Sequence, residues 1–223
     1  EIESYISKKD GDLLQTDPWL IFEESIINPE KYLGEKGKTL FSSTNQKIWK
    51  YVPNAKKNLY KLFSRCQLNN DQSREIIEPQ NYFATVEEII DNLYLVYEIF
   101  RNLNLNFSFN QIDKALLPPE KFRLAFPLPT ESALSDNLDD RRIRALAVSI
   151  LENAAAEGHS ILPLKDVLEQ MKTKVFDDSF PINLDILSAI AETDFFQIEV
   201  LPGSQPPDTH QIIRYFIKKS YYH

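Results

Sequence analysis

The chain has 223 residues, of which 43% are hydrophobic, and its formal net charge at pH 7 is −8. This length is sufficient for one large or two small domains with buried cores, and no apolar run of about 18 residues is present that would span a membrane. The negative charge argues against a protein coated uniformly by nucleic acid but permits a local basic face. The single cysteine, Cys66, excludes an internal disulfide framework and suits a reducing compartment, so we expect a cytoplasmic protein.

The ends of the chain carry no visible processing signal. The chain begins at Glu1, its only methionine is Met171, and no charged-then-apolar leader with a cleavage site is present. We therefore expect a piece of a longer protein, whose function depends in part on segments outside it.

Residues 1–126 have the pattern of a helical domain after a polar leading segment. The first helix is predicted to begin at Asp17-Pro18, because aspartate caps free backbone N–H groups and proline suits the first helical position. The clearest helix begins at Thr85, which forms a capping-box pattern with Glu88 ahead of a wide apolar face. The predicted helices of this domain cover residues 18–28, 54–65, 70–78, 85–100, 108–117 and 119–126.

A linker and a second domain of a different kind follow. Residues 127–140 are rich in proline, serine and aspartate without periodicity, which predicts a linker. In residues 141–223, three helical patterns precede a β-hairpin pattern. Gly158 can adopt the left-handed conformation that ends a helix, and Pro163 can start the next one. The expected helices are 141–157, 164–172 and 183–193, the expected strands are 195–201 and 211–218, and residues 159–162 are a candidate third strand.

Helices followed by a hairpin in this order are typical of a winged helix. We therefore predict a mainly α protein, with a helical N-terminal domain at 1–126 and a winged-helix-like domain at 141–223.

A basic stretch at residues 36–65 contains eight lysine and arginine residues and no acidic residue, with aromatic residues between the cations. Phosphate neutralisation combined with aromatic stacking is what binding of single-stranded nucleic acid requires. The pattern leaves open a solvated basic face whose aromatic rings turn inward as core. The residues predicted to bind nucleic acid are Lys47, Trp49, Lys50, Lys56, Lys57, Tyr60, Lys61 and Arg65.

The second domain lacks the residues of a DNA reader. A recognition helix needs arginine, lysine, asparagine or glutamine facing the bases. The corresponding helix reads NLDILSAIAETD at 183–194, with Asp185, Glu192 and Asp194 and no basic residue, and residues 202–210 also lack lysine and arginine. We expect this domain to pack against protein.

Catalytic and cofactor patterns are weak. The segment GEKGKT at 34–39 resembles the end of a phosphate-binding loop, but Tyr32 stands where that loop needs a glycine. The histidines are too scattered for a metal motif, and Cys66 has no neighbouring base in the sequence. His159 directly follows a predicted helix end, where a structural role is expected. We expect no catalytic residue, cofactor or metal site in this chain.

One segment resembles a known family. RIRALAVSILENAAAEGHSILPLKDVLEQM resembles the segment that precedes the motor in RecD-like superfamily 1 DNA helicases and their large bacterial relatives. The shared features are an arginine-rich helix start, a small-residue helix and a Gly-His-x-x-Leu-Pro turn. The matching residues are Arg141, Arg144, Gly158, His159, Leu162 and Pro163.

Upstream segments extend the resemblance to roughly residues 59–200. FSRCQLNNDQSREII and NLYLVYEIFR resemble the helix-hairpin-helix-like region of that family, although the family's Asn-Pro-Tyr-Leu-Leu is Asn-Leu-Tyr-Leu-Val at 92–96. IDKALLPPEKFRLAFPLPTESAL resembles the connector of the large relatives. Residues 1–55 match no family.

The resemblance implies a non-catalytic accessory region of a bacterial ATP-dependent DNA helicase, which contacts DNA and docks onto the motor. ATP and Mg²⁺ are expected only in that motor, because the Walker motifs are absent from this chain. The expected partners are single-stranded or forked DNA, bound weakly, and the rest of the parent chain or a partner protein, with no membrane. The alternative is a protein–protein interaction module of a bacterial defence or chromosome-maintenance complex, and an independent small enzyme is a more distant one.

Overall fold

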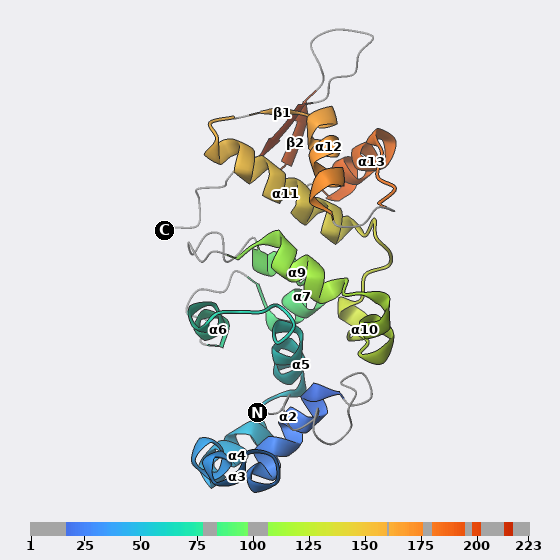
Figure 1. Cartoon of the computed structure of the whole chain (residues 1–223). Coiled ribbons are helices and arrows are strands. Elements are labelled where there is room, and N and C mark those ends of the chain that lie inside the picture. The colour runs from blue at the N-terminus through green and yellow to red at the C-terminus, as the bar shows by residue number, and fades with distance from the viewer. Residues whose placement is uncertain are drawn as a thin grey trace. The chain divides into compact units, whose positions relative to one another are not determined.

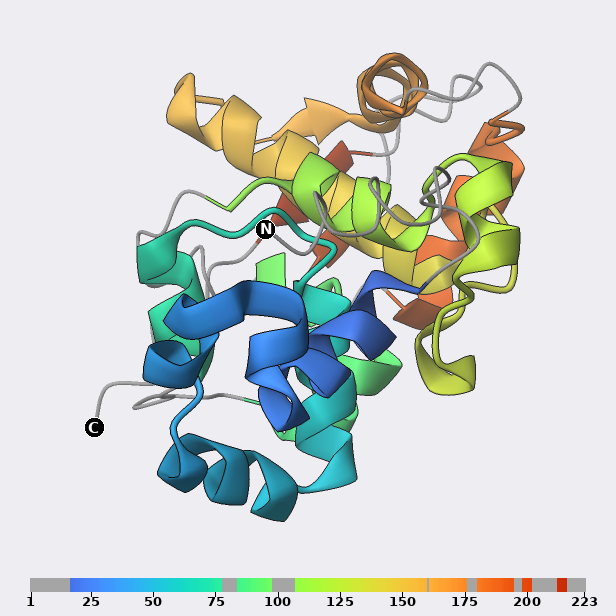
Figure 2. The same ribbon diagram turned by 60° about the horizontal axis from the view of Figure 1, so that its bottom comes forward.

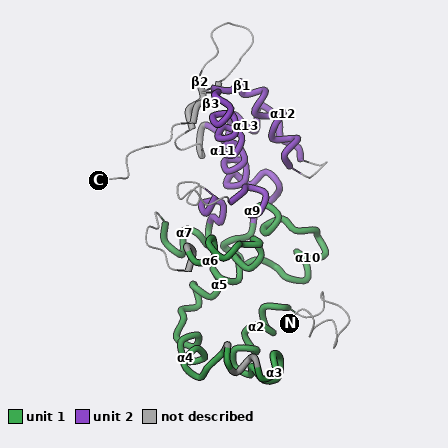
Figure 3. The backbone as a smooth tube through the Cα atoms, turned by 60° about the vertical axis from the view of Figure 1, so that its left-hand side comes forward, with its two compact units in different colours: residues 1–91, 113–133 green, residues 92–112, 134–223 purple. Residues whose placement is uncertain are grey.

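The computed structural model describes residues 17–77, 84–97, 107–159, 161–175, 180–194, 198–201 and 212–215. The protein is mainly helical, as its sequence predicts (Figure 1). It divides into two compact units, in which unit 1 comprises Glu1–Asp91 and Asp113–Ala133 and unit 2 comprises Asn92–Ile112 and Leu134–His223 (Figure 3). One boundary falls inside the predicted linker 127–140, whereas residues 92–112, expected in the N-terminal domain, group with the second unit.

Unit 1 opens with the predicted helix α2 (Pro18–Ile27), whose first turn is capped by Asp17. The Asp17 carboxylate accepts a hydrogen bond of 2.9 Å from the backbone N–H of Trp19. Two further helices, α3 (Pro29–Leu40) and α4 (Ser43–Tyr51), contact α2 (Figure 2). No residue of α4 is buried, and neither α3 nor α4 is among the helices that the sequence predicts.

The core of unit 1 lies between two predicted helices. Helix α5 (Asn54–Phe63) buries Leu59, Leu62 and Phe63 and packs against α7 (Val86–Asp91). The capping box is confirmed, because the backbone N–H of Thr85 donates to the Glu88 carboxylate at 2.7 Å and the backbone N–H of Glu88 donates to the Thr85 hydroxyl at 3.2 Å. The remaining helices of unit 1 are α6 (Asn70–Ile77), α10 (Glu120–Ala125) and the 3₁₀ helix η1 (Thr130–Ser132).

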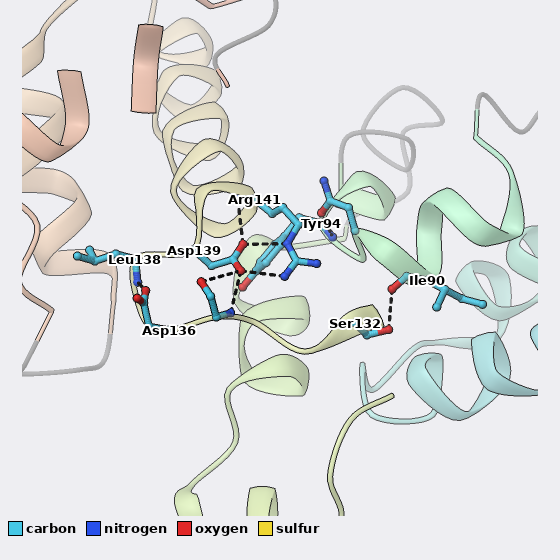
Figure 4. Close-up of polar contacts among 9 residues, drawn as sticks. Ile90, Tyr94, Ser132, Asp136, Leu138, Asp139 and Arg141 are labelled. Atoms are coloured by element: carbon cyan, nitrogen blue, oxygen red, sulfur yellow. Dashed lines mark hydrogen bonds and ion pairs between the residues drawn. The ribbon is translucent and has the colours of Figure 1, made fainter. Parts of the chain in front are cut away.

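Buried Ser132 ties η1 to α7. Its hydroxyl donates a hydrogen bond of 2.6 Å to the backbone carbonyl of Ile90 (Figure 4). This contact joins positions 42 residues apart in the chain. Residues 127–133 of the predicted linker are therefore fastened to the core of unit 1.

The helix predicted to run from residue 85 to residue 100 is shorter than expected, because α7 ends at Asp91. The side-chain oxygen of Asn92 accepts a hydrogen bond of 3.1 Å from the backbone N–H of Tyr94. This local turn competes with continuation of the helix. Residues 98–100 lie outside the described residues.

Unit 2 is built around α11 (Asp140–Ala156), which contacts α12 (Leu164–Lys174), α13 (Leu184–Asp194) and strand β3 (Ile212–Tyr215). Every residue from 145 to 151 is buried, as expected of a helix enclosed on several sides. Strands β1 (Leu162–Pro163), β3 and β2 (Ile198–Leu201) form an antiparallel sheet in the order β1-β3-β2.

Residues from the segment 92–112 belong to the same unit. The Tyr97 hydroxyl donates a hydrogen bond of 2.6 Å to the Glu152 carboxylate on α11. Tyr94 stacks on Phe109, with ring centroids 5.7 Å apart and planes 15° apart. Phe109 opens α9 (Phe109–Leu116), the helix through which the division between the units passes.

The turn after α11 has the conformation that its sequence predicts. Gly158 has φ +94°, a left-handed value that favours glycine. The backbone N–H of His159 donates to the carbonyl of Ala154 at 2.9 Å, and that of Gly158 donates to the carbonyl of Ala155 at 3.0 Å. These paired bonds form a Schellman motif, so the backbone of the Gly-His pair ends the helix.

Asp139 organises the start of α11. Its carboxylate accepts hydrogen bonds from the backbone N–H of Arg141 at 3.1 Å and from that of Ser135 at 3.0 Å, and it forms an ion pair of 2.8 Å with the Arg141 guanidinium (Figure 4). Burial alone would raise the pKa of Asp139. The hydrogen bonds from Arg141 and Ser135 and the Arg141 charge outweigh burial, so the pKa lies below the ordinary aspartate value.

Candidate nucleic-acid interface

Four aromatic side chains from separate helices of unit 1 form the aromatic cluster, which consists of Trp19 and Phe22 from α2, Trp49 from α4 and Tyr60 from α5. Trp49 lies at its centre. Its ring stacks on Tyr60 with centroids 6.3 Å apart and planes 25° apart, and it meets Phe22 edge-on at 5.9 Å. Trp19 lies 6.2 Å from Trp49. The rings of Trp49 and Tyr60 are partly exposed, so the cluster reaches the surface.

The chain brings Trp49 and Tyr60 together through a short break between α4 and α5. Trp49 occupies the last turn of α4, and Tyr60 occupies the second turn of α5. Pro53 lies between the helices in an extended conformation and lacks the N–H that would continue α4. The break reverses the chain so that the two rings meet.

Two lysine side chains lie against rings of the aromatic cluster, and two more are exposed on α4. The Lys57 ammonium group is 5.3 Å from the centroid of the Trp49 ring, and the Lys56 ammonium group is 5.9 Å from that of Tyr60. Lys47 and Lys50 are exposed on α4, three residues apart and therefore on neighbouring positions of one helix face. Within the described part of the chain, no carboxylate forms an ion pair with any of these four lysines.

Two of the predicted binding residues have structural partners. The Lys61 ammonium group forms an ion pair of 3.2 Å with Asp17. The Arg65 guanidinium donates hydrogen bonds to the backbone carbonyls of Phe126 at 3.0 Å and Pro127 at 3.3 Å, and burial lowers its pKa. These contacts hold α5 to segments distant in the sequence.

The structure therefore separates the predicted set. It brings four residues together at the aromatic cluster, leaves Lys47 and Lys50 exposed on α4, and engages Lys61 and Arg65 within unit 1. The side chains of Lys36 and Lys38 lie outside what the structure describes. The four residues at the aromatic cluster are Trp49, Lys56, Lys57 and Tyr60.

A pocket with a volume of about 490 Å³ opens beside the aromatic cluster. Its walls are apolar on the side of the cluster, and one part of its lining is polar. Small-molecule pockets in proteins have volumes of about 300–1,000 Å³, so this one is large enough for a planar ring system. The lining residues are Trp19, Phe22, Trp49, Tyr60, Phe63, Ser64, Gln67, Leu68 and Ser73.

Trp19 and Phe22 are site residues that sequence reasoning missed. Both lie in the continuous apolar run at the start of α2, where every side chain has the composition of a core. No local signal distinguishes an aromatic ring that faces a pocket from one that faces the core. Their role follows only from their packing against Trp49.

Gln67 stands at the edge of the pocket in an unusual backbone conformation. Its φ is +51°, the only positive value among the described non-glycine residues. A side chain at such a φ costs about 1 kcal/mol or more relative to an ordinary conformation. Backbone strain of this kind is retained where the surrounding structure holds it, which here is the turn that links α5 to α6.

Cys66, next to this turn, is unsuited to nucleophilic chemistry. Its side chain is fully buried, and its sulfur donates to the Leu62 carbonyl at 3.7 Å. Burial raises the pKa of the thiol to about 12, so the reactive thiolate is scarce at neutral pH. In the part of the chain that the structure describes, no group of three histidine, cysteine or acidic side chains is arranged to hold a metal ion.

Helix α13 of unit 2 presents a different surface. Its described side chains include exposed Asp185 and Leu184, which is 41% exposed, and the helix contains no lysine or arginine. The side chains of Glu192 and Asp194 and the whole of residues 202–210 lie outside the described residues. The part of α13 that is described carries no cation to attract a phosphate.

Comparison with known proteins identifies no relative. No protein-family model matches the chain, and no curated protein and no solved structure matches it significantly. None of the helices that the structure describes is both long enough and apolar enough to cross a bilayer.

Proposed function

We propose that unit 1 contacts single-stranded DNA through the aromatic cluster and four lysines, of which Lys56 and Lys57 lie beside the cluster and Lys47 and Lys50 are exposed on α4. The observation that carries this proposal is the placement of the Lys56 and Lys57 ammonium groups over partly exposed aromatic rings. Single-stranded nucleic acid offers the matching chemistry, since its phosphates need cations and its unpaired bases stack on aromatic rings. The absence of carboxylates between residues 36 and 65 keeps this surface from repelling phosphates.

We propose that unit 2 is a winged helix that binds protein rather than DNA. Its element order of helix, strand, two helices and two strands supports a winged helix, as does the sheet order β1-β3-β2. The lack of cations on α13 supports a protein partner, because a groove-reading helix needs donors for base edges and phosphates.

In the larger protein, this chain would be a non-catalytic accessory region of a RecD-like DNA helicase. The resemblance of residues 141–171 to the segment before that motor supports this assignment. Unit 1 would then hold the strand while unit 2 docks on the motor, where ATP and Mg²⁺ would bind.

A fluorescence titration tests the DNA contact directly. Both tryptophans of the chain, Trp19 and Trp49, belong to the aromatic cluster, so fluorescence excited selectively from tryptophan reports on this surface. Titration with an oligothymidylate at several salt concentrations should quench the fluorescence and give weak, salt-dependent binding. Loss of two phosphate contacts in a Lys56→Gln/Lys57→Gln variant should reduce the slope of log K against log salt by about 1.4.

The matched control changes two exposed lysines of unit 2. A Lys165→Gln/Lys172→Gln variant removes the same charge from α12, where no aromatic cluster lies. Its binding and salt slope should equal those of the unaltered protein. An equal loss of slope in both variants would mean that net charge alone drives binding, and an absence of binding would remove the proposed DNA contact.

A protein-interaction module is the second candidate, favoured by the exposed Leu184 beside the exposed Asp185 on α13. Under this hypothesis, a partner protein is retained after nuclease treatment and is lost in a Leu184→Lys/Asp185→Lys variant. Retention of that partner together with an absence of DNA quenching would favour this function over the first.

A further inference from the structure

The pocket beside the aromatic cluster has the properties of a receptor for one flat, partly polar ring. Trp19, Phe22, Trp49 and Tyr60 supply its apolar walls. With a volume of about 490 Å³, it exceeds what a single aromatic side chain fills. A ligand that uses such walls well is planar, because flat rings stack on aromatic faces or meet their edges.

The polar part of the lining offers hydrogen bonds to the edge of such a ring. The Ser64 hydroxyl donates to the carbonyl of Lys61 at 2.7 Å, and the Ser73 hydroxyl donates to the carbonyl of Asn69 at 2.8 Å. Because each hydroxyl proton is already engaged, each oxygen presents lone pairs as acceptors. N–H groups, which every nucleobase carries on its edge, complement these acceptors.

The positive charge beside the pocket favours an anionic ligand over an apolar one. Lys57 lies against the Trp49 ring, and Lys56 lies against the Tyr60 ring, so two ammonium groups stand beside residues that line the pocket. An apolar peptide side chain has no need of these cations. A nucleotide does, since its base is flat and its phosphates are anionic.

The geometry points to a pocket for a single unpaired base of a DNA strand that crosses α4 and α5. This inference rests on the proposed DNA contact of unit 1 and adds a specific mode, in which one base leaves the strand and inserts among Trp19, Phe22, Trp49 and Tyr60. Lys56 and Lys57 then neutralise the phosphates on either side of the inserted base.

Abasic DNA tests whether the bases contribute to binding at all, which base insertion requires, and the variant described next separates insertion from stacking on the surface of the cluster. The full chain is titrated with an oligothymidylate and with an oligomer of the same length that carries tetrahydrofuran abasic sites throughout, so that the charge is kept and every base is removed. Base insertion predicts that the abasic oligomer binds at least ten-fold more weakly and fails to quench the tryptophans, while the salt slopes of the two oligomers remain equal.

A variant that fills the pocket provides the second arm. Ser73→Phe places a ring in the pocket and leaves all four surface lysines unchanged, so it should reduce affinity for the oligothymidylate to that for the abasic oligomer. Thr173→Phe on α12 is the matched control, because the Thr173 hydroxyl also bonds a preceding helical carbonyl and lies outside unit 1. Urea unfolding of both variants verifies that each is folded.

The outcomes are distinct. Equal affinity and equal quenching with the two oligomers, or unchanged binding by folded Ser73→Phe, would overturn base insertion while leaving the DNA contact in place. Failure of both oligomers to bind would overturn the proposed function itself. Loss of binding and quenching confined to the abasic oligomer and to Ser73→Phe would establish the pocket as the base receptor.

Discussion

Two lysines of unit 1 and two cations of unit 2 lie in contrasting surroundings. In unit 1, Lys56 and Lys57 lie over partly exposed aromatic rings and have no carboxylate partner among the described residues. In unit 2, Arg142 is 2% exposed, with its guanidinium bonded to the Asn137 carbonyl at 2.8 Å. Lys174 of unit 2 is also half-buried, and burial lowers its pKa.

This difference indicates where an anionic polymer could bind. A cation that is already desolvated and hydrogen-bonded inside a unit gains little from a phosphate, whereas an exposed lysine releases counterions when it meets one. The net charge of −8 counts buried and exposed cations equally, so it does not show which of them can bind an anion. Arg142 and Lys174 are therefore engaged within unit 2, whereas Lys56 and Lys57 remain available for binding in unit 1.

The largest expected effect tests whether the units behave separately. Leu146→Ala removes a fully buried side chain of α11 and should cost about 2–5 kcal/mol of unfolding free energy, through lost burial and the cavity that remains. Because both tryptophans lie in unit 1, the urea transition seen by tryptophan fluorescence should stay in place, while the transition seen by circular dichroism should acquire an earlier phase.

DNA binding by the same Leu146→Ala variant is the companion measurement. Quenching by the oligothymidylate should match that of the unaltered protein at urea concentrations too low to unfold unit 2. A shift of both the fluorescence transition and the circular dichroism transition would contradict this prediction, because it would mean that the two units unfold together.

An intermediate effect is expected at the centre of the aromatic cluster. Trp49→Ala should weaken binding of a fluorescein-labelled oligothymidylate by about 1–3 kcal/mol, the usual contribution of one stacked base. Phe122→Ala is the control, because Phe122 is also a partly exposed ring with a lysine, Lys121, at 5.0 Å, but lies on α10 outside the cluster. Similar losses in the two variants would show that any exposed ring beside a lysine suffices.

The smallest expected effect concerns the internal electrostatics of unit 2. The pKa of Asp139 in the folded protein is lowered, so its contribution to stability is present above the unfolded-state value, which is about 3.9. This contribution is lost as the pH falls through the lower, folded-state pKa. Asp139→Asn keeps a side chain that can cap α11 but removes the negative charge at the helix N-terminus, which should cost about 1 kcal/mol or less at pH 7 and should flatten the acid limb of the stability profile.

Urea unfolding followed by circular dichroism from neutral to acidic pH measures this effect. Asp166→Asn, in the first turn of α12, is an exposed control for which a smaller change at pH 7 is expected. If Asp139→Asn retained the full acid dependence of the unaltered protein, the Asp139–Arg141 pair would not be a source of that dependence. DNA binding should be unaffected by either variant.

Much of the secondary structure could be predicted because its signals are local. The cap at Asp17, the capping box at Thr85 and Glu88, and the helix end at Gly158 each depend on hydrogen bonds between residues a few positions apart. The exceptions are α3 and α4, which the sequence does not predict, and the early end of α7, where the side chain of Asn92 accepts a local hydrogen bond.

The site could be predicted only in part. The sequence alone determined most of the helices and their order, with α3 and α4 as exceptions, the acid-free run of cations with interleaved aromatic residues, and the lack of cations on α13, because these features follow from composition and short-range spacing. Tertiary structure decided that Lys61 meets Asp17, 44 residues away, that Arg65 meets carbonyls more than 60 residues away, and that α2 supplies two walls of the pocket. Contacts over such separations depend on how the helices pack, and no local propensity encodes that packing.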